Sequence, residues 1–437
     1  MAINRRDFIK SSSVLAAGMA TVPMFANSSL GHLSANDTIN VALIGCRRGW
    51  SVLLKFFSHK NVRCLALCDV KQDLLAEKAA YIAEKYGKKP DLYTDYRRVL
   101  ERKEIDIVII ATPDHWHCLQ FVDSCRAGKD IYLEKPIANS IAESEIMVDV
   151  AKKSNVIVQV GQQQRSDTLW IEAMDYLKSG TLGRIGRIHA WANFSYGAMR
   201  PPVPDSPAPE TLDYDMWLGP APKMPFNQRR FGWRMFWDYG GGLMTDWGVH
   251  LLDMGLWAMD IKTTPLQTLA AGGKFLHPEG AHETFDTLNI TYQFKDFVMT
   301  WENNGGVDTG PYGKNYGVLF RGTNGSLVAD RQSWKIYPEG EKIPVVEVAS
   351  DQRDLQNHVD NFLHCVKNRN PETACTIENG SLCAKYAHLG NIGARMGGGA
   401  LIYDEQTRKF NIAEADKYLK PDYRKPWLFP TESSAVL

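Results

Sequence analysis

The chain has 437 residues, which is enough for two or three domains of ordinary size, and 44% of them are hydrophobic. This composition excludes a disordered or fibrous protein. Lysine and arginine together number 50, as do aspartate and glutamate, so the sequence carries no net excess of basic residues. The balance argues against a nucleic-acid surface or a polybasic membrane patch, and we expect a small-molecule partner, no nucleic acid and no stable membrane insertion.

The N-terminal 38 residues differ from the rest. Arg5 and Arg6 form a twin-arginine start, and an alanine-rich run from Val14 to Ala26 follows that is too short to span a bilayer. The pattern predicts a twin-arginine export signal and linker over residues 1–38, cleaved somewhere after Ala26, and hence a periplasmic protein. An ordinary amphipathic N-terminus is the alternative.

The eight cysteines contain no Cys-x-x-Cys pair, so the sequence supports neither a zinc ribbon nor a redox motif. We expect most of them to be buried as small apolar residues, with Cys64 and Cys68 on one face of the same strand. His115 and His117 could form a metal pair, but no third ligand accompanies them in the sequence. We therefore expect no metal, and instead a helix start with one ring near a cofactor.

A dinucleotide-binding unit is predicted at the start of the folded chain. Ile39–Ile44 forms an apolar strand that ends at Gly45, and a second buried strand, Val62–Cys68, ends at Asp69. A tight glycine turn brings backbone N–H groups and a helix N-terminus to a pyrophosphate, and an acidic residue about twenty positions later accepts the ribose hydroxyls. Asp69 would repel a 2'-phosphate, which favours NAD over NADP.

The glycine turn departs from the usual G-x-G-x-x-G pattern. Counting from Gly45, the second and third positions hold Arg47 and Trp50, so only one of three glycines is in place. A turn shortened by one residue would let Gly49 serve as the last glycine. The basic side chain of Arg47 or Arg48 could then bind a phosphate by charge. On its own this turn is a weak signal for a cofactor.

Strands and helices continue to alternate, which predicts a parallel sheet covered on both faces over residues 39–165, a Rossmann-type domain. A buried strand, Ile105–Ala111, ends at Thr112 and Pro113, and the strand beginning at Asp130 ends at Glu134-Lys135-Pro136. Ligands in such sheets bind outside the carboxyl ends of the strands. Lys135 is therefore placed to point at a substrate, although a surface ion pair with Glu134 is the plain alternative. The remaining predicted elements are the strand Val156–Val160 and the helices Leu74–Tyr86, Arg97–Arg102, Cys118–Ala127 and Ser140–Ser154.

The pattern changes over residues 166–437, where short alternating strands with tight turns predict a mainly antiparallel sheet and an α+β domain with a C-terminal arm. The predicted strands are Ile188–Tyr196, Leu266–Ala270, Thr287–Phe294, Phe297–Trp301, Gly317–Arg321 and Ser326–Ala329. Three helices are also expected, at Asp167–Ser179, Asp354–Lys367 and Glu378–Arg395.

A second dense cluster lies between Phe231 and Asp253. If a helix begins near Thr245, then Asp246, His250 and Asp253 share one helix face. A carboxylate one turn from an imidazole would orient the ring and raise its basicity, as a general base requires, although a satisfied polar stripe is the alternative. Aromatic rings beside glycines also suit a sugar-binding cleft. The weaker substrate-cleft candidates are Arg165, Trp233, Arg234 and Tyr239.

From about Asn40 to Tyr403 the chain resembles the Gfo/Idh/MocA family of oxidoreductases. The resemblance rests on Glu134-Lys135-Pro136, Thr112-Pro113 with His117, Gly161–Arg165, Trp217–Pro220 and Asp246-x-x-x-His250. It implies a Rossmann domain, an open-sheet domain whose outer face often forms dimers or tetramers, and oxidation or reduction of a sugar or cyclitol hydroxyl with NAD(P). The glycine turn is where the chain departs most from the family.

The resemblance implies that Lys135, Asp246 and His250 are catalytic. With the first-domain motifs it implies a cofactor site made by Gly45, Cys46, Arg47, Arg48, Gly49, Asp69, Thr112, Pro113, His117, Glu134 and Lys135. The leading hypothesis is an NAD-dependent oxidation of a sugar or glycoside at C3, giving a keto-glycoside. Alternatives are an NAD-using glycosidase that acts by oxidation and elimination, an inositol-type dehydrogenase, and a catalytically silent sugar-binding protein.

Overall fold

The computed structural model describes residues 38–194 and 199–431, so the predicted export signal lies outside the described residues. The first domain is a six-stranded parallel sheet in the order β3-β2-β1-β4-β5-β6. Its strands are β1 (Ile39–Ile44), β2 (Val62–Cys68), β3 (Asp91–Tyr93), β4 (Ile107–Ile110), β5 (Asp130–Leu133) and β6 (Val158–Val160). Every residue of β4 and β5 is buried, because helices cover both faces.

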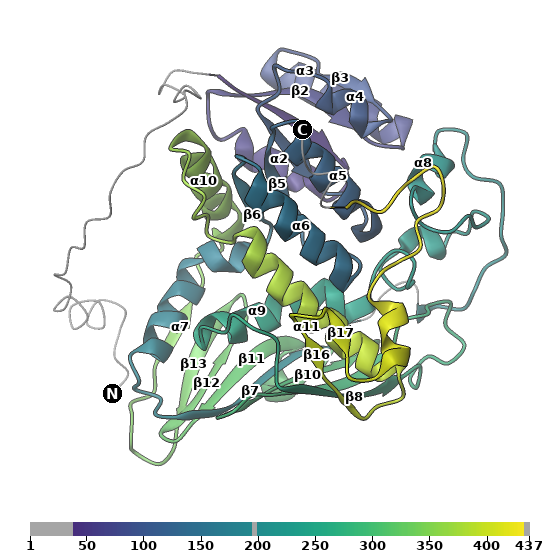
Figure 1. The fold of residues 1–437 in the computed structure, drawn as a ribbon. Helices are drawn as coiled ribbons and strands as arrows, with labels where there is room; N and C mark the ends of the chain where they lie inside the picture. The colour runs from purple at the N-terminus through teal and green to yellow at the C-terminus, as the bar shows by residue number, and fades with distance from the viewer. Residues whose placement is uncertain (1–37, 195–198, 432–437) are drawn as a thin grey trace.

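Five helices pack on this sheet, and Figure 1 shows the domain in the upper half of the molecule. They are α2 (Gly49–Phe56), α3 (Gln72–Tyr86), α4 (Tyr96–Leu100), α5 (Asp114–Arg126) and α6 (Ile141–Lys153). The side chain of Ser140 caps α6 by accepting the N–H of Glu143, and the carboxylate of Asp95 caps α4 in the same way from Arg97. These caps fix where the two helices begin, and hence where the loops that follow the preceding strands end.

The second domain is a nine-stranded sheet in the order β14-β13-β12-β11-β7-β10-β9-β8-β15. Among the described residues, β7 and β10 form the one parallel pair of this sheet, and its other neighbouring strands are antiparallel. The predicted combination of a parallel Rossmann sheet with a mainly antiparallel sheet is confirmed. The strands are β7 (Ile185–Ala192), β8 (Gln267–Gly273), β9 (Thr287–Gln293), β10 (Val298–Asn304), β11 (Tyr316–Gly322), β12 (Gly325–Ala329), β13 (Ser333–Pro338), β14 (Glu347–Ala349) and β15 (Ala400–Leu401).

Helices α7 (Thr168–Lys178), α9 (Val249–Ala258) and α11 (Ile377–Arg395) lie on one side of this sheet, between it and the first domain in Figure 1. Helix α11 contacts both β8 and α6, so it joins the two domains. Helix α10 (Asp354–Lys367) behaves differently from the prediction, which placed residues 166–437 in the second domain. Its Val359 and Phe362 are buried in the Rossmann core, where Phe362 packs edge-on against Phe56.

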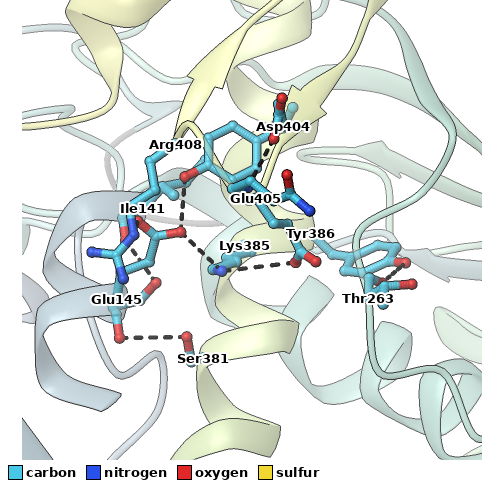
Figure 2. Close-up of polar contacts among 12 residues, drawn as sticks. Ile141, Glu145, Thr263, Ser381, Lys385, Tyr386, Asp404, Glu405 and Arg408 are labelled. Atoms are coloured by element: carbon cyan, nitrogen blue, oxygen red, sulfur yellow. Dashed lines mark hydrogen bonds and ion pairs between the residues drawn. The ribbon is translucent and has the colours of Figure 1, made fainter. Parts of the chain in front are cut away.

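The C-terminal arm closes the joint between the domains. The hairpin β16 (Tyr403–Asp404) and β17 (Lys409–Phe410) lies over the buried carboxylate of Glu145 on α6. This carboxylate accepts a 2.8 Å hydrogen bond from the Tyr403 hydroxyl and forms an ion pair with Nζ of Lys385 of α11 at 2.9 Å. Figure 2 shows Glu145 and Lys385 pointing toward each other. Arg408 adds an ion pair at 3.4 Å. Helix α6, helix α11 and the C-terminal hairpin thus meet at the carboxylate of Glu145.

All eight cysteines are free and buried, as expected. The prediction that Cys64 and Cys68 share a strand face is wrong: Cys64 packs in one core of the first domain and Cys68 in the other. The reason is a register shift in the pairing of β1 with β2, where Val41 pairs with Cys64 but Ala42 with Ala66. One extra residue in a strand sends the following side chains to the opposite face. Within the part of the chain that is described, no helix is long and apolar enough to cross a membrane.

Candidate active site

A cavity of about 690 Å³ opens at the carboxyl end of the Rossmann sheet, where an open parallel sheet is expected to bind its ligand. It is lined by the residues that follow β1, β2, β4 and β5 and by residues 216–234 of the second domain. Of the predicted cofactor and catalytic residues, those that line it are Gly45, Arg47, Arg48, Asp69, Thr112, Pro113, Glu134 and Lys135.

The glycine turn has the shortened form, with Gly45 as its first glycine and Gly49 as its last. Gly45 has φ +93°, and a Cβ there would lie 2.5 Å from the carbonyl oxygen of Ala111, so only glycine fits. A Cβ on Gly49 would lie 2.5 Å from Cδ1 of Leu43, which shows that α2 packs closely on β1. That close helix–strand contact is the task of the last glycine in a dinucleotide fingerprint. Neither Gly49 nor Cys46 lines the cavity, whereas Arg47 and Arg48 do.

Asp69 follows β2 at the cavity wall, and its two carboxylate oxygens accept the N–H groups of Cys46 (2.7 Å) and Lys71 (3.0 Å). Burial raises the pKa of Asp69 above its ordinary value. A carboxylate held at this point can accept ribose hydroxyls and disfavours a 2'-phosphate. Together with the glycine cradle, this donor and acceptor set fits NAD.

His117 belongs to the wall behind the cavity rather than to its lining. Its ring nitrogens lie 2.7 Å from the carbonyl oxygen of Pro136 and 2.9 Å from that of Thr112. Burial lowers the pKa of His117 to about 4. The ring therefore ties together the loops that follow β4 and β5, and the predicted direct contact of His117 with a cofactor is corrected to a positioning role.

Lys135 meets the second domain at Asp246. Its Nζ donates to Oδ1 of Asp246 at 2.7 Å and to the backbone oxygen of the same residue at 2.8 Å. Arg234 also pairs with Oδ1 of Asp246, at 3.2 Å. A lysine ammonium has three N–H donors, so the two bonds to Asp246 leave one for a ligand oxygen.

The predicted hold of Asp246 on the ring of His250 is not made through Nδ1 of that ring. Residues Met244–Gly248 form a π-helix, and α9 begins only at Val249. Such π turns are frequent at functional sites. The carboxylate is shared by Lys135 and Arg234, and Nδ1 of His250 is buried without a hydrogen-bond partner among the described residues.

Asp253 and Arg165 also differ from the prediction. Arg165 donates two parallel hydrogen bonds to Asp253, at 2.8 and 2.7 Å, and both side chains are buried. The pair links the 3-10 helix that follows β6 to α9, and neither residue lines the cavity. Arg165 therefore forms a structural ion pair with Asp253 at the joint between the domains. Its position does not support the predicted contact with a substrate.

Asp246 raises the pKa of His250 as predicted, but the net shift of that pKa is downward. Burial lowers the pKa of His250 well below its ordinary value, and the charges of Arg331 and Lys135 lower it further, whereas Asp246 acts weakly in the other direction. A histidine with a lowered pKa is neutral near pH 7. The ring is thus available to accept a proton, and the raising effect of Asp246 on its pKa is outweighed by burial and by the two cations.

Of the two aromatic residues predicted to contact the substrate, one lines the cavity and the other is buried in its wall. Trp233 lines the cavity, and the guanidinium of Arg234 lies 4.4 Å over its ring. Tyr239 is fully buried beneath them, 5.1 Å from the ring of His115. Of the predicted substrate residues, Trp233 and Arg234 are exposed to the cavity, while Tyr239 supports the wall from behind.

Sequence reasoning missed Asp114, which lines the cavity directly after Thr112-Pro113. Its Oδ1 is buried without a hydrogen-bond partner among the described residues, and burial raises its pKa well above the ordinary value. The signal was present, since Asp114 follows a strand end as Lys135 does. Neighbouring His115 lies 3.1 Å from the carbonyl oxygen of Trp217. Across the described residues there is no group of three or more potential metal ligands.

Two family models match the chain. The model described as the oxidoreductase family's NAD-binding Rossmann fold covers residues 39–162, and the one described as its C-terminal alpha/beta domain covers residues 187–429. The chain belongs to the Gfo/Idh/MocA oxidoreductase family. The predictions of this family, of an oxidoreductase and of NAD as its cofactor are thereby confirmed.

Among curated proteins, the chain is similar to glycosyl hydrolase family 109 proteins of Shewanella. It is 25% identical to protein 1 of strain ANA-3 and 27% identical to the protein of strain W3-18-1, each over 203 residues. These alignments cover 42% of this chain and 44% of each relative, so less than half of the relatives' length is matched.

Solved structures share the fold at low identity. The aldose-aldose oxidoreductase of Caulobacter crescentus superposes with a TM-score of 0.62 at 19% identity, over 82% of this chain and 98% of the other. A levoglucosan dehydrogenase in complex with NADH and levoglucosan gives a TM-score of 0.61 at 19% identity, over 83% and 98%. An oxidoreductase domain protein of Kribbella flavida gives 0.63 at 18%, also over 83% and 98%.

Proposed function

We propose that this protein oxidises a ring hydroxyl of a sugar or glycoside with NAD, at C3 of a glucoside or disaccharide, to give a keto-glycoside. The observation that carries the proposal is the contact of Lys135 with Asp246. It brings a cation from the end of β5 against the helical segment of the second domain that bears His250. Similarity to sugar-binding oxidoreductases of the same fold supports a sugar substrate.

The proposed roles follow from the charges and bonds of the site. Bound NAD+ would accept the hydride when the hydroxyl carbon is oxidised. His250 is neutral and takes the hydroxyl proton, while the remaining N–H of Lys135 donates to the developing alkoxide. Asp246 is a positioning residue, because it holds the amine of Lys135 and the guanidinium of Arg234.

We propose that the nucleotide and the sugar occupy different parts of the cavity. Gly45, Arg47, Arg48 and Asp69 would hold the nucleotide, with Arg48 already close to Glu134 at 3.6 Å. Trp233 offers a flat ring for the C–H face of a sugar. The test is to identify the nucleotide released on denaturing the purified protein and then to follow reduced-nicotinamide absorbance while disaccharides and glycosides are added. Protein that neither contains nor binds NAD would contradict the proposal.

A second candidate function is an NAD-using glycosidase that oxidises C3 transiently so that the aglycone leaves by elimination. The similarity to glycosyl hydrolase family 109 proteins favours it. A nitrophenyl glycoside separates the two functions. Release of nitrophenol without a net change in nicotinamide redox state indicates the glycosidase. Accumulation of NADH together with a keto-glycoside whose glycosidic bond is intact indicates the dehydrogenase.

We also propose that the protein is exported to the periplasm by the twin-arginine route, based on Arg5 and Arg6, and that copies associate through the outer face of the second sheet. Figure 1 shows α7, α9 and α11 on one side of that sheet only, and Leu269 of β8 is 40% exposed. Replacing both arginines by lysine should retain the protein in the cytoplasm on cell fractionation. Light scattering of the purified protein should give a dimer or tetramer mass.

A further inference from the structure

Arg331 lies at the turn between β12 and β13, and its charge lowers the pKa of His250. Its guanidinium lies 4.9 Å over the ring of Trp247, and its Nε donates to Oε1 of Gln164 at 3.2 Å. Nη2 is buried and has no hydrogen-bond partner among the described residues. One edge of the guanidinium is therefore left without an acceptor.

No carboxylate of the described chain pairs with Arg331 within 4.0 Å, although three acidic side chains face it from further away. Asp354 accepts the backbone N–H of Leu355, and Asp167 accepts that of Leu169. Asp246 is already shared by Lys135 and Arg234. Each of these carboxylates is engaged elsewhere.

An arginine in this position cannot relieve its burial by losing a proton, because its pKa stays above the range of proteins' working pH. Burying a charge without a partner is costly, and buried guanidinium groups are ordinarily paired with a carboxylate or phosphate. The chain itself supplies no such partner in its described part. An anion that enters with a ligand would supply it.

Arg331 comes near His250 through Trp247, and it is not among the residues that line the cavity at the end of the Rossmann sheet. The ring of Trp247, on which Arg331 stacks, lies 5.9 Å from the ring of His250, and Arg331 is the charge with the largest effect on His250. Lys135, Arg234 and Arg331 are cations in this region, and Asp246 is the carboxylate that pairs with the first two. Asp114 also lies near Lys135 and Arg234, but burial raises its pKa and so favours its neutral form. The site is therefore more positive than a neutral sugar requires.

We propose that the substrate is an anionic sugar, a uronic acid or its glycoside in the first instance, whose oxyanion bonds to the free Nη2 of Arg331 while its ring hydroxyl faces His250. This deepens the proposed function and rests on it. A carboxylate, a sulfate and a phosphate each offer a pair of acceptor oxygens to the N–H groups of a guanidinium. Sugars that carry each of these groups are separate arms of the test.

The experiment compares methyl glucuronide with methyl glucoside as paired substrates for the full chain loaded with NAD. The kcat/KM of the wild-type protein should favour the acid at least tenfold. Arg331→Gln should remove that preference, whereas Arg331→Lys should keep part of it because the charge remains. Arg321→Gln is the matched control, since Arg321 lies exposed on β11 of the same sheet. Thermal unfolding and NAD titration show that each variant is folded.

Direct binding of glucuronate, measured by calorimetry with NAD present, separates the inference from the proposed function. Uronate binding that Arg331→Gln abolishes supports the inference even if no sugar is oxidised, in which case the proposed function fails alone. Oxidation of neutral and acidic glycosides at equal rates overturns the inference and leaves the function standing. If Arg331→Gln weakens NAD as much as the sugar, the anion is the cofactor's phosphate and the inference is wrong. A stronger response to the sulfated or phosphorylated sugar supports the anion site and identifies its oxyanion.

Discussion

Replacing Lys135 with methionine removes the amine that joins the two domains at the site while keeping a side chain of similar length. In the native protein this amine donates to Oδ1 and to the backbone oxygen of Asp246, and both side chains are 12% exposed. The variant leaves the carboxylate of Asp246 paired with Arg234 at 3.2 Å. The change therefore removes a donor to the alkoxide without leaving a bare buried charge.

The two effects have different sizes. Loss of one charge-stabilising donor typically costs about 100-fold to 1,000-fold in kcat, which is roughly 2.7–4 kcal/mol. Leaving a buried ion without any partner costs about 3–5 kcal/mol of folding free energy, and because Arg234 remains, the loss of stability should stay below that range. The positive charge of Lys135 also lowers the pKa of His250, so that pKa should rise in the variant.

The assay is the pH profile of kcat with the best sugar from the substrate panel, together with NAD titration and thermal unfolding. Lys135→Met should lower kcat by the stated factor and move the acid limb of the profile to higher pH, with NAD still bound. Lys103→Met is the control, because Lys103 is exposed on the first domain. A variant that keeps its full kcat, or that shows the loss with an unmoved acid limb, would refute the reasoning.

Three further predictions concern the base, the cofactor cradle and the domain joint. Because the pKa of His250 is lowered, the proton-accepting neutral form persists below pH 6.5, and the wild-type kcat should fall only at lower pH; His250→Gln should remove this limb together with most of the activity. Gly45→Ala puts a Cβ 2.5 Å from the oxygen of Ala111 at φ +93°, so calorimetry should show at least tenfold weaker NAD binding and thermal unfolding a loss of about 1–3 kcal/mol. Asp253→Ala leaves Arg165 buried without its partner and should cost about 3–5 kcal/mol in denaturant unfolding while the lining of the cavity is unchanged.

Much of the fold could be predicted because its strands carry a simple signal. β4 and β5 are buried on both faces and stand in the sequence as unbroken apolar runs, so their ends, and with them Thr112 and Lys135, could be located. β13 and β14 were not predicted: β13 has only two buried residues, Trp334 and Ile336, and β14 has none. That α10 packs on the first domain is a tertiary contact with no local sequence signal.

The site was less predictable than the fold for physical reasons. The spacing of Asp246 and His250 predicted that the carboxylate orients the ring, but Nδ1 of His250 has no hydrogen-bond partner among the described residues. Asp246 then bonds to the stronger partners at hand, Lys135 and Arg234. Arg331 follows a strand that supplies no chemical motif, so only the folded chain shows that its guanidinium stacks on Trp247, whose ring lies 5.9 Å from that of His250.

The central claim is that Lys135 and His250 act on a single carbon from which hydride passes to NAD. The most direct measurement uses a glycoside deuterated at the oxidised carbon and follows the label into the nicotinamide ring by mass spectrometry, in the wild-type protein and in the Lys135→Met and His250→Gln variants. The account predicts that deuterium appears in the nucleotide and that both variants slow its transfer while NAD remains bound. Sugar conversion without deuterium in the nucleotide, or transfer at the wild-type rate in either variant, would contradict it.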